Sequence, residues 1–444
     1  MRVLHTGDWH VGRNLKGRDR TGEIGRALEE ILAMLRTEGA QLLLVAGDVF
    51  DSPNPSAEAE SVVYEFFRQV GELGVPSVII AGNHDSPARL EGISGLLKRV
   101  NAHATGRVRT AQEGGVLRFQ VGSEAAMVGA LPFLSERRLV KAAQLLGEDV
   151  SAWRRTYQEG MNFFTGSLAK GFQADTVNLL MLHATLEGAK PSGSEHQFYL
   201  TGSYTVDPAH LPSGAQYVAV GHLHRNQQLR DIPPVHYSGS VVQLDFGEAG
   251  EEKVVKLIEV SPRRPARVHD LPLTLESPLK VVRASLANLP RALDAEKGFP
   301  GFIKAVVRLD TPQPYLKDRI LGEYPNVLAL EAELPDVDVT SARKLDVDLS
   351  PLEAYLAYYR ERWNATPDDS VVNAFRELYR ETQGEDLPDA RPDALPDEPV
   401  ALKPKPRRAR TATSGNRRET PAPEPAGLDA EDEGLGLEEV DVQL

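Results

Sequence analysis

Short apolar runs alternate with helix-like stretches along the first 250 residues or so of the chain. Each run is a few residues long and ends at glycine, proline or a polar cluster, as strands buried on both faces of a sheet do. The runs cover residues 2–6, 41–46, 77–81, 126–131, 177–182 and 217–220, and the helical stretches cover 23–37, 57–73 and 87–100. This alternation predicts an α/β domain, over about 1–270, in which helices cover a sheet.

The pattern changes in the later part of the chain. Two runs, 235–242 and 254–260, have fewer helices between them, which predicts that the sheet becomes antiparallel there. A smaller α+β unit is expected over 277–347, without a cluster of acids or histidines of its own. Its predicted strands are 279–284, 302–309 and 327–333, and its predicted helices are 289–296 and 315–323.

A pair of amphipathic helices is predicted over 350–382. Ser350 and Glu353 have the spacing of a capping box, with proline in the first turn, and 366–369 repeats the start signal. Apolar stripes then follow at helical spacing, and their side chains either pack on the chain's own core or dock another protein. The docking candidates are Leu352, Tyr355, Leu356, Tyr359, Trp363, Phe375 and Leu378.

Composition narrows the class of protein. The chain has 444 residues, 41% of them hydrophobic, and no cysteine, which excludes disulfides, thiolate metal sites and cysteine nucleophiles and fits a reducing cytoplasm. No apolar stretch is long enough to span a membrane. The tail, 383–444, is rich in proline and charge and is predicted to be disordered, with a basic block at 403–410. The net charge of −14 is unusual for a nucleic-acid-binding protein, but bound cations would reverse the field of an acidic site.

Five short motifs carry the candidate chemistry, and each follows a predicted strand. Each combines a potential metal ligand with the end of a strand, where a parallel sheet presents its catalytic loops, and four include a glycine turn. One such motif alone would be weak, because most Gly-Asp pairs are turns and most strand-end histidines are structural. The motifs are 7–10 (GDWH), 47–51 (GDVFD), 82–85 (GNHD), His183 in LMLHAT, and 221–224 (GHLH).

The ligand types point to a pair of divalent ions. Carboxylate, imidazole and carboxamide without sulfur suit Mn, Fe or Zn better than Cu(I) or Ca. Seven candidate ligands exceed the needs of one octahedral ion and fit two ions that share a bridging carboxylate. Such a pair activates water and neutralises phosphate oxygens, and an imidazole nearby can assist the leaving group. The motifs therefore predict phosphoester hydrolysis.

The same motifs resemble those of the calcineurin-like metallophosphoesterases and, among these, the SbcD family of nuclease subunits. The resemblance is close over about 1–250, in GDWHVGR, GDVFDSPNPS, GNHDSPARL, GHLHRNQ and SGSVVQLDFGE, and looser through the second unit and the helix pair. It implies a calcineurin-like β-sandwich covered by helices, a small capping domain, a C-terminal helix pair and a disordered tail.

The resemblance also implies residue roles. One metal ion would be held by Asp8, His10 and His224, and the other by Asn83, His183 and His222. Asp48 would bridge the two ions, which in this family are preferably manganese. His84 would be the catalytic imidazole that binds no metal, and Asp51 would orient the ligands or His84.

Partners follow from the same resemblance. The family cuts DNA ends or hairpins in repair and recombination, together with an SbcC-like coiled-coil ATPase that docks on helices placed like 350–382. It forms homodimers through helices of the nuclease domain. The candidate dimer faces here, which are equally explained as core stripes, contain Val62, Val63, Phe66, Phe67, Val70, Leu90, Ile93, Leu96 and Leu97.

Basic residues near the metal motifs are candidates for contacts with DNA phosphates, which mostly involve arginine and lysine. They are Arg13, Lys16, Arg18, Arg20 and Arg89, and as isolated surface charges they would need no function.

Two other functions compete with a DNA nuclease. A phosphodiesterase or phosphatase for small substrates could use the same metal motifs. However, protein phosphatases of this superfamily usually continue the second motif with Arg-Gly, where this chain has Ser52 and Pro53. A scaffold subunit with a vestigial site is disfavoured because all seven ligand positions hold suitable residues.

Overall fold

The computed structural model describes residues 1–122, 124–135, 157–195, 205–309, 315–333, 350–363, 366–367 and 369–383. Contacts divide the chain into two units, Met1–Val337 and Asp338–Leu444. The predicted disordered tail and its basic block at 403–410 lie outside the described residues, except that residue 383 still belongs to a helix.

The first of two six-stranded sheets has the order β16-β15-β1-β4-β5-β6. Its strands are β1 (Arg2–Thr6), β4 (Leu42–Val45), β5 (Ser77–Ile80), β6 (Ala102–Thr105), β15 (Val254–Ser261) and β16 (Arg264–Pro272). β1, β4, β5 and β6 are parallel, whereas β15 pairs antiparallel with both β1 and β16. The sheet therefore becomes antiparallel at the 254–260 run, as predicted.

The second sheet has the order β13-β14-β12-β9-β8-β7. Its strands are β7 (Val116–Val121), β8 (Glu124–Leu131), β9 (Val177–His183), β12 (Tyr217–Gly221), β13 (Gln227–Asp231) and β14 (Pro234–Tyr237). The strand predicted over 235–242 is shorter, because β14 ends at Tyr237; it pairs antiparallel with β13, as predicted, but parallel with β12. Antiparallel pairing is confined in this sheet to its edge strands, β7 and β13.

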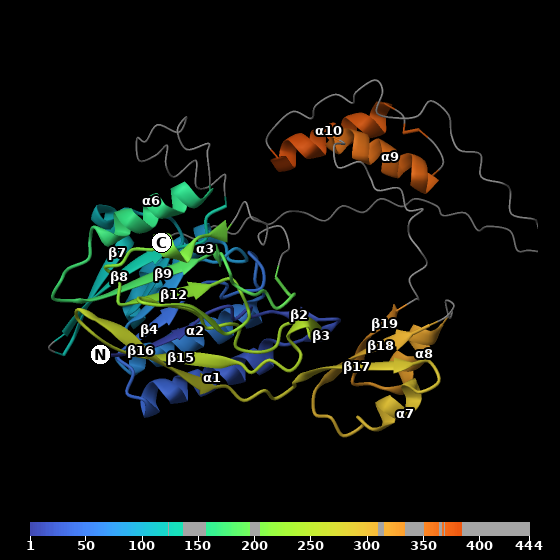
Figure 1. Cartoon of the computed structure of the whole chain (residues 1–444), viewed down its shortest axis with the longest axis horizontal. Coiled ribbons are helices and arrows are strands. Elements are labelled where there is room, and N and C mark those ends of the chain that lie inside the picture. The colour runs from blue at the N-terminus through green and yellow to red at the C-terminus, as the bar shows by residue number, and fades with distance from the viewer. Residues whose placement is uncertain are drawn as a thin grey trace, which may run out of the picture. The chain divides into compact units, whose positions relative to one another are not determined.

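The two sheets face each other and helices cover their outer faces (Figure 1). Helices α1 (Thr21–Thr37), α2 (Ala57–Glu72) and α3 (Pro87–Leu97) lie on the first sheet, and α6 (Tyr157–Ala169) lies on the second. Alternation along β1 explains the layers, because Val3 belongs to the core between the sheets and Leu4 to the core beneath the helices. The predicted α/β sandwich covered by helices is confirmed.

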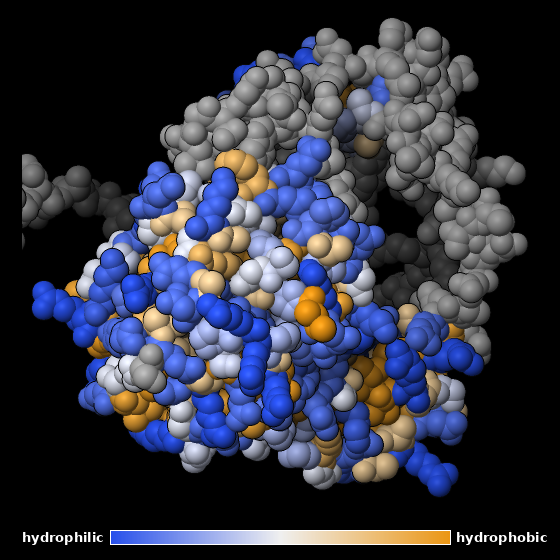
Figure 2. Space-filling view, turned by 60° about the vertical axis from the view of Figure 1, so that its left-hand side comes forward, coloured by the Kyte–Doolittle hydropathy of each residue, from blue (hydrophilic) through white to orange (hydrophobic). Residues whose placement is uncertain are grey.

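Short elements complete this part of the chain. They are β2 (Asn14–Leu15), β3 (Arg18–Asp19), β10 (Thr185–Leu186), β11 (Thr205–Val206), and the helical turns η1 (Lys98–Val100), η2 (Ala111–Gly115), η5 (Pro208–His210) and η6 (Phe246–Glu248). On the face shown in Figure 2, apolar side chains are scattered among polar ones, as is usual for a protein surface.

The small α+β unit has the predicted order of elements: β17 (Leu279–Ser285), α7 (Leu289–Asp294), β18 (Phe302–Arg308), α8 (Leu316–Glu323) and β19 (Val327–Glu333). Its three strands are parallel, and both helices contribute to its own core. Leu279 also packs with Leu15 and Phe246 of the sandwich. This buried contact joins the two parts of the first unit.

The second unit contains helices α9 (Pro351–Trp363) and α10 (Asp369–Gln383). The predicted capping box is present, because Glu353 accepts from the Ser350 main chain at 2.6 Å and the Ser350 hydroxyl accepts from Glu353 N–H at 3.3 Å. Tyr355 stacks on Phe375 at 4.1 Å. The two stripes thus partly cover each other. None of the helices in the described ranges is long and apolar enough to cross a membrane.

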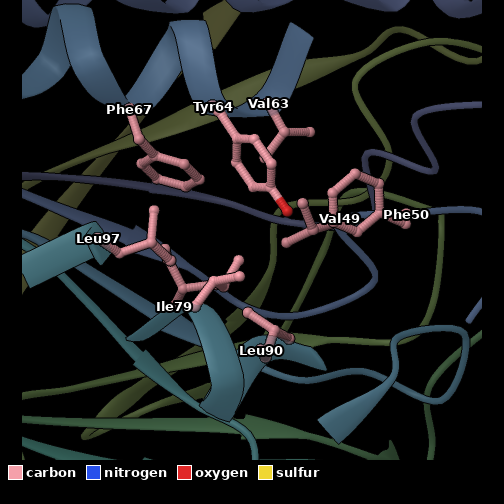
Figure 3. Close-up of a pocket in the computed structure, with 9 residues that line it drawn as sticks. Val49, Phe50, Val63, Tyr64, Phe67, Ile79, Leu90 and Leu97 are labelled. Atoms are coloured by element: carbon pink, nitrogen blue, oxygen red, sulfur yellow. The ribbon is translucent and has the colours of Figure 1, made fainter. Parts of the chain in front are cut away.

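The apolar faces of α2 and α3 are mostly internal. Val63, Phe66, Phe67, Val70, Leu90 and Leu97 are at most 6% exposed and belong to the core beneath the first sheet. Figure 3 shows side chains from α2 pointing at those of β5 and α3 around a small apolar pocket. The interpretation of these six residues as a dimer face is therefore corrected. Among the candidates, Leu96 is 74% exposed, and Val62 and Ile93 are partly buried.

Candidate metal centre

The strand ends of both sheets bring the five motifs to one place. Asp8 and His10 follow β1, Asp48 follows β4, and Asn83 follows β5. From the second sheet, His183 ends β9, and His222 and His224 follow β12. Donor atoms of Asp8, His10 and His224 lie within 4.8 Å of one another, as do those of Asp48, His183 and His222. All six of these side chains are buried.

The backbone at these motifs is held in an uncommon conformation. Asp8, His10, Asp48 and His222 have φ angles of 50°, 50°, 49° and 102°, a region that costs on the order of 1–3 kcal/mol for residues other than glycine. The glycines of the motifs permit close approach. A Cβ atom on Gly82 would collide with the Asp48 carboxylate, and one on Gly47 would collide with His183. The local backbone is thus arranged around the side chains of the centre.

Asp8, His10 and His224 form what we call the first ligand group. The Nε2 atoms of His10 and His224 lie 3.2 Å apart. The Nδ1 atom of His10 faces Asp51 Oδ1 at 3.1 Å, and that of His224 faces Ser194 Oγ at 2.6 Å. The Asp8 carboxylate accepts the His222 main-chain N–H at 3.0 and 3.1 Å.

Asn83, His183 and His222 form the second ligand group. Asn83 Oδ1 lies 3.0 Å from His183 Nε2 and 2.7 Å from His222 Nδ1. The other nitrogen of His183, Nδ1, donates to the Ala46 carbonyl at 2.7 Å. Asp48 lies between the groups, since its Oδ2 is 3.6 Å from His10 Nε2 and 3.4 Å from His183 Nε2. Its position suits a bridging carboxylate.

The spacing of the donor atoms suits a metal ion. Each imidazole of the first group presents Nδ1 to an oxygen, so the two Nε2 atoms, 3.2 Å apart, are the nitrogens that could bind a metal. Neighbouring ligands about 2.1 Å from an octahedral ion lie about 3 Å apart, which matches the spacing here.

The charges in the cluster also favour the binding of a cation. Burial lowers the pKa of His10 to about 4 and that of His222 well below its usual value, so both are neutral at pH 7. Burial also disfavours charge on His183, but the Asp48 carboxylate beside it raises the pKa of His183 to about 9. In the metal-free chain a proton on His183 therefore supplies positive charge, which bound metal would replace.

Comparison with known families is consistent with this geometry. The family model for calcineurin-like phosphoesterases matches residues 1–226. The SbcD component of the SbcCD nuclease from Bacillus subtilis (strain 168) is 30% identical over 397 residues, which cover 87% of this chain and 100% of that protein. The chain belongs to the SbcD family of calcineurin-like phosphoesterases.

Other relatives in the SbcD family agree. The SbcCD nuclease component of the same kind from Rhodobacter capsulatus is 32% identical over 382 residues, covering 80% of this chain and 86% of the relative. That of Escherichia coli (strain K12) is 28% identical over 304 residues, covering 66% and 74% respectively. As a calcineurin-like phosphoesterase with clustered histidine and aspartate ligands, the chain is a metal-dependent hydrolase of phosphoesters.

His84 and Asp51 lie beside the candidate ligands. The His84 main-chain N–H donates to Asp48 Oδ1 at 2.8 Å, and its ring packs edge-on to His10 at 4.6 Å between centroids. His84 Nδ1 donates to the Asp51 main-chain carbonyl at 3.0 Å. The Asp51 carboxylate instead faces His10 and Arg13. Of the two predicted alternatives, these contacts favour orientation of the candidate ligand His10, because only the main chain of Asp51 contacts His84.

Several residues that support the centre were missed by the sequence analysis. Asp85 accepts main-chain N–H groups of Val49, Phe50 and Gly82 at 3.2, 3.0 and 2.9 Å, and thereby joins the loops after β4 and β5. Phe133 stacks on His222, with ring centroids 6.0 Å apart. The last residue of the GNHD motif was a usable signal for Asp85. Glu248 ends the SGSVVQLDFGE motif, which was a usable signal for it, whereas no local pattern marks Phe133, Ser194 or Lys253.

The basic residues that were predicted to contact DNA differ in their surroundings. Lys16 and Arg18 are exposed on the β2–β3 hairpin. Arg13 and Arg89 are partly exposed and are paired with Asp51 and Glu60 at 3.1 and 2.5 Å.

Arg20 is only 2% exposed. It donates to Glu23 and to the Gln243 carbonyl at 2.5 and 3.1 Å, and lies over the Phe302 ring. Its role is to join the sandwich to the α+β unit, which corrects the prediction of a DNA contact.

Proposed function

We propose that this chain is a two-metal DNA nuclease that cuts DNA ends or hairpins in repair and recombination, working with an SbcC-like ATPase. One observation carries the proposal: seven potential ligands from five separate motifs meet in a single buried cluster with His84 beside it. The names of the relatives, which describe them as parts of a nuclease, support a nucleic acid as the substrate.

Two manganese ions are the proposed cofactors. Asp8, His10 and His224 would hold one, Asn83, His183 and His222 the other, and Asp48 both, with imidazole and oxygen ligands that suit manganese. Bound ions of this kind lower the pKa of water and neutralise charge on phosphate oxygens.

His84 is the proposed catalytic residue. Its main chain is fixed on Asp48 at 2.8 Å and its Nδ1 on the Asp51 carbonyl at 3.0 Å, so the ring cannot turn away from the centre. Unlike the buried histidine ligands, it is partly exposed and within reach of a bound phosphodiester. From there the imidazole can stabilise developing charge or protonate the leaving oxygen.

DNA contacts are proposed at the β2–β3 hairpin. Leu15 is buried against Phe246 and Leu279 and anchors the hairpin, while Lys16 and Arg18 extend into solvent. Arg13 and Arg89 could contribute where their acidic partners leave a donor available. Such contacts bind the backbone of any sequence and weaken with salt.

The α9–α10 pair is the proposed docking element for the ATPase. Leu352 is 2% exposed, whereas Tyr355, Leu356, Tyr359 and Phe375 are partly buried. The side chains of Trp363 and Leu378 lie outside the described residues. Deleting 350–383 should abolish pull-down of the ATPase without loss of metal, and undiminished binding would contradict this role.

A homodimer through α2 and α3 is also proposed, on the narrower set of Val62, Ile93 and Leu96. Leu96→Glu should then shift the purified chain from dimer to monomer in sedimentation, and an unchanged mass would refute this face. A cytoplasmic location is proposed, because bacterial DNA lies there.

The decisive experiment offers the purified chain linear duplex DNA, single-stranded DNA and an aryl phosphodiester, with manganese and then with a chelator. Manganese-dependent cutting of DNA that is lost in Asp8→Asn would support the proposal. Turnover of the small ester alone, also in the presence of the ATPase and ATP, would favour the small-substrate alternative. No turnover of any substrate would favour the scaffold alternative.

A further inference from the structure

A chain of buried and partly buried polar groups extends away from the centre behind His224. Ser194 Oγ lies 2.6 Å from His224 Nδ1 and 2.6 Å from Glu248 Oε1. Glu248 Oε2 in turn accepts from Lys253 Nζ at 2.5 Å. Glu248 is 0% and Lys253 1% exposed, so these charges are paired away from water. A buried ion pair need not stabilise the fold. A role of the Glu248–Lys253 pair in the metal centre is therefore considered.

The Glu248 carboxylate acts only as a hydrogen-bond acceptor. Besides Lys253 and Ser194, it accepts from the Ser240 hydroxyl at 2.9 Å and from Leu244 N–H at 3.2 Å. The Ser194 hydroxyl must therefore donate to Glu248 and present a lone pair to His224. This requires hydrogen on His224 Nδ1, so Nε2, the atom that faces His10, is the nitrogen that can bind a metal.

The same network also fixes the backbone of His224. Lys253 Nζ donates to the His224 carbonyl at 2.9 Å, and Glu195 accepts its N–H at 3.0 Å. His224 is thus held at its N–H, its carbonyl and its ring nitrogen. Neither its tautomer nor its orientation can change without breaking a buried contact.

We propose that Ser194, Glu248 and Lys253 form a positioning relay that sets the tautomer and orientation of His224 as a metal ligand. The inference rests on the proposed metal centre but not on the nature of the substrate. Outer groups of this kind typically affect metal affinity about 10- to 100-fold. The relay should act on the first ligand group and leave the second group unaffected.

The test measures manganese binding by titration calorimetry in the absence of DNA. Glu248→Gln should weaken one of the two binding events about 10- to 100-fold, leaving the other unchanged. Glu251→Gln is the matched control, because Glu251 also contacts Lys253, at 3.4 Å, but does not contact His224. Unchanged binding in a folded Glu248→Gln protein, or equal weakening of both events, would overturn the relay.

A second pair of variants keeps the test valid if Glu248→Gln does not fold. Ser194→Ala leaves the Glu248–Lys253 pair intact and should weaken the same binding event, and Ser194→Thr, which retains the hydroxyl, should restore it. Failure of threonine to restore binding, or no loss with alanine, would refute the role of the hydroxyl. Metal binding is measured without substrate. An absence of nuclease activity would therefore contradict the proposed function but not the relay.

Discussion

Carboxylates contact both histidines of the first ligand group, whereas in the second group His183 contacts a main-chain carbonyl. Asp51 faces His10 at 3.1 Å, and Glu248 lies 3.2 Å from His224 Nδ1 in addition to its link through Ser194. In the second group, His183 donates to Ala46, and His222 packs on Phe133.

This difference bears on how each group would hold a cation. A carboxylate that accepts from Nδ1 raises the basicity of the imidazole and fixes its orientation, whereas a carbonyl such as the one that His183 contacts does so less. We therefore expect tighter binding at the first group and easier exchange at the second. Five predictions test this comparison, from the largest expected effect to the smallest.

Replacing Asp48, the carboxylate that lies between the two groups, should affect both groups and so abolish the difference between them. Asp48→Asn keeps the shape of the side chain but removes the charge near His10 and His183. Each metal supplies several kcal/mol of transition-state stabilisation, so activity should fall at least about 1,000-fold. Metal content and turnover check this, with the exposed Asp175→Asn as control. Full activity with two bound metals would rule out bridging.

His84 belongs to neither ligand group, so replacing it should reduce turnover without affecting metal binding. His84→Gln should keep both metals and reduce turnover roughly 100- to 10,000-fold, the usual contribution of a general acid or base. Metal analysis and single-turnover kinetics check the two parts. Unchanged turnover would exclude His84 from the mechanism, and loss of a metal would make it a ligand, as its proximity to His10 and Asp48 also allows.

Asp51→Asn should weaken the first group alone. It removes the carboxylate that faces His10, and affinity for one manganese ion should fall about 10- to 100-fold. The control is Asp207→Asn, which removes a carboxylate 3.1 Å from the exposed His210, outside the centre. Titration calorimetry distinguishes the two sites, and a loss at the weaker site would reverse the comparison.

Metal binding at the second group should depend on pH between pH 7.5 and 9. The pKa of His183 is raised to about 9 in the metal-free chain, so His183 carries a proton below that pH and must lose it to bind metal. Affinity should therefore rise up to about tenfold per pH unit and level off above pH 9. Calorimetry in buffers of different ionisation enthalpy should detect the released proton, and pH-independent binding would contradict this account.

Phe133→Leu should have the smallest effect. The ring packs on His222 but supplies neither charge nor a hydrogen bond, so affinity at the second group should change less than about threefold. Thermal unfolding should show a modest loss of stability, and repacking of this kind usually costs less than about 1.5 kcal/mol. A tenfold loss of affinity would mean that packing orients a ligand as strongly as a carboxylate does.

Local sequence determined the main parts of the centre in advance. Each ligand stands in or directly after a short apolar strand, most of them beside a glycine, and parallel strands present such ends along one edge of a sheet. Asp8, Asp48 and His183 could therefore be placed together from local sequence context before any contact was known. The order of elements and the capping box at Ser350 were also readable, because periodicity and caps depend on neighbours in the chain.

Only the tertiary structure decided which residues lie behind the ligands and which apolar or basic side chains are buried. Ser194 and Lys253 are common residue types in unremarkable local contexts, and they meet Glu248, the last residue of a motif, because distant segments pack behind His224. Arg20 resembles a surface charge until the α+β unit is seen to cover it. A stripe at helical spacing is the same whether it faces the protein's own core or a partner, and the direction of β14 depends on its pairing with β12. Burial and long-range pairing are properties of the whole fold, so they leave no signature in the residues next to them.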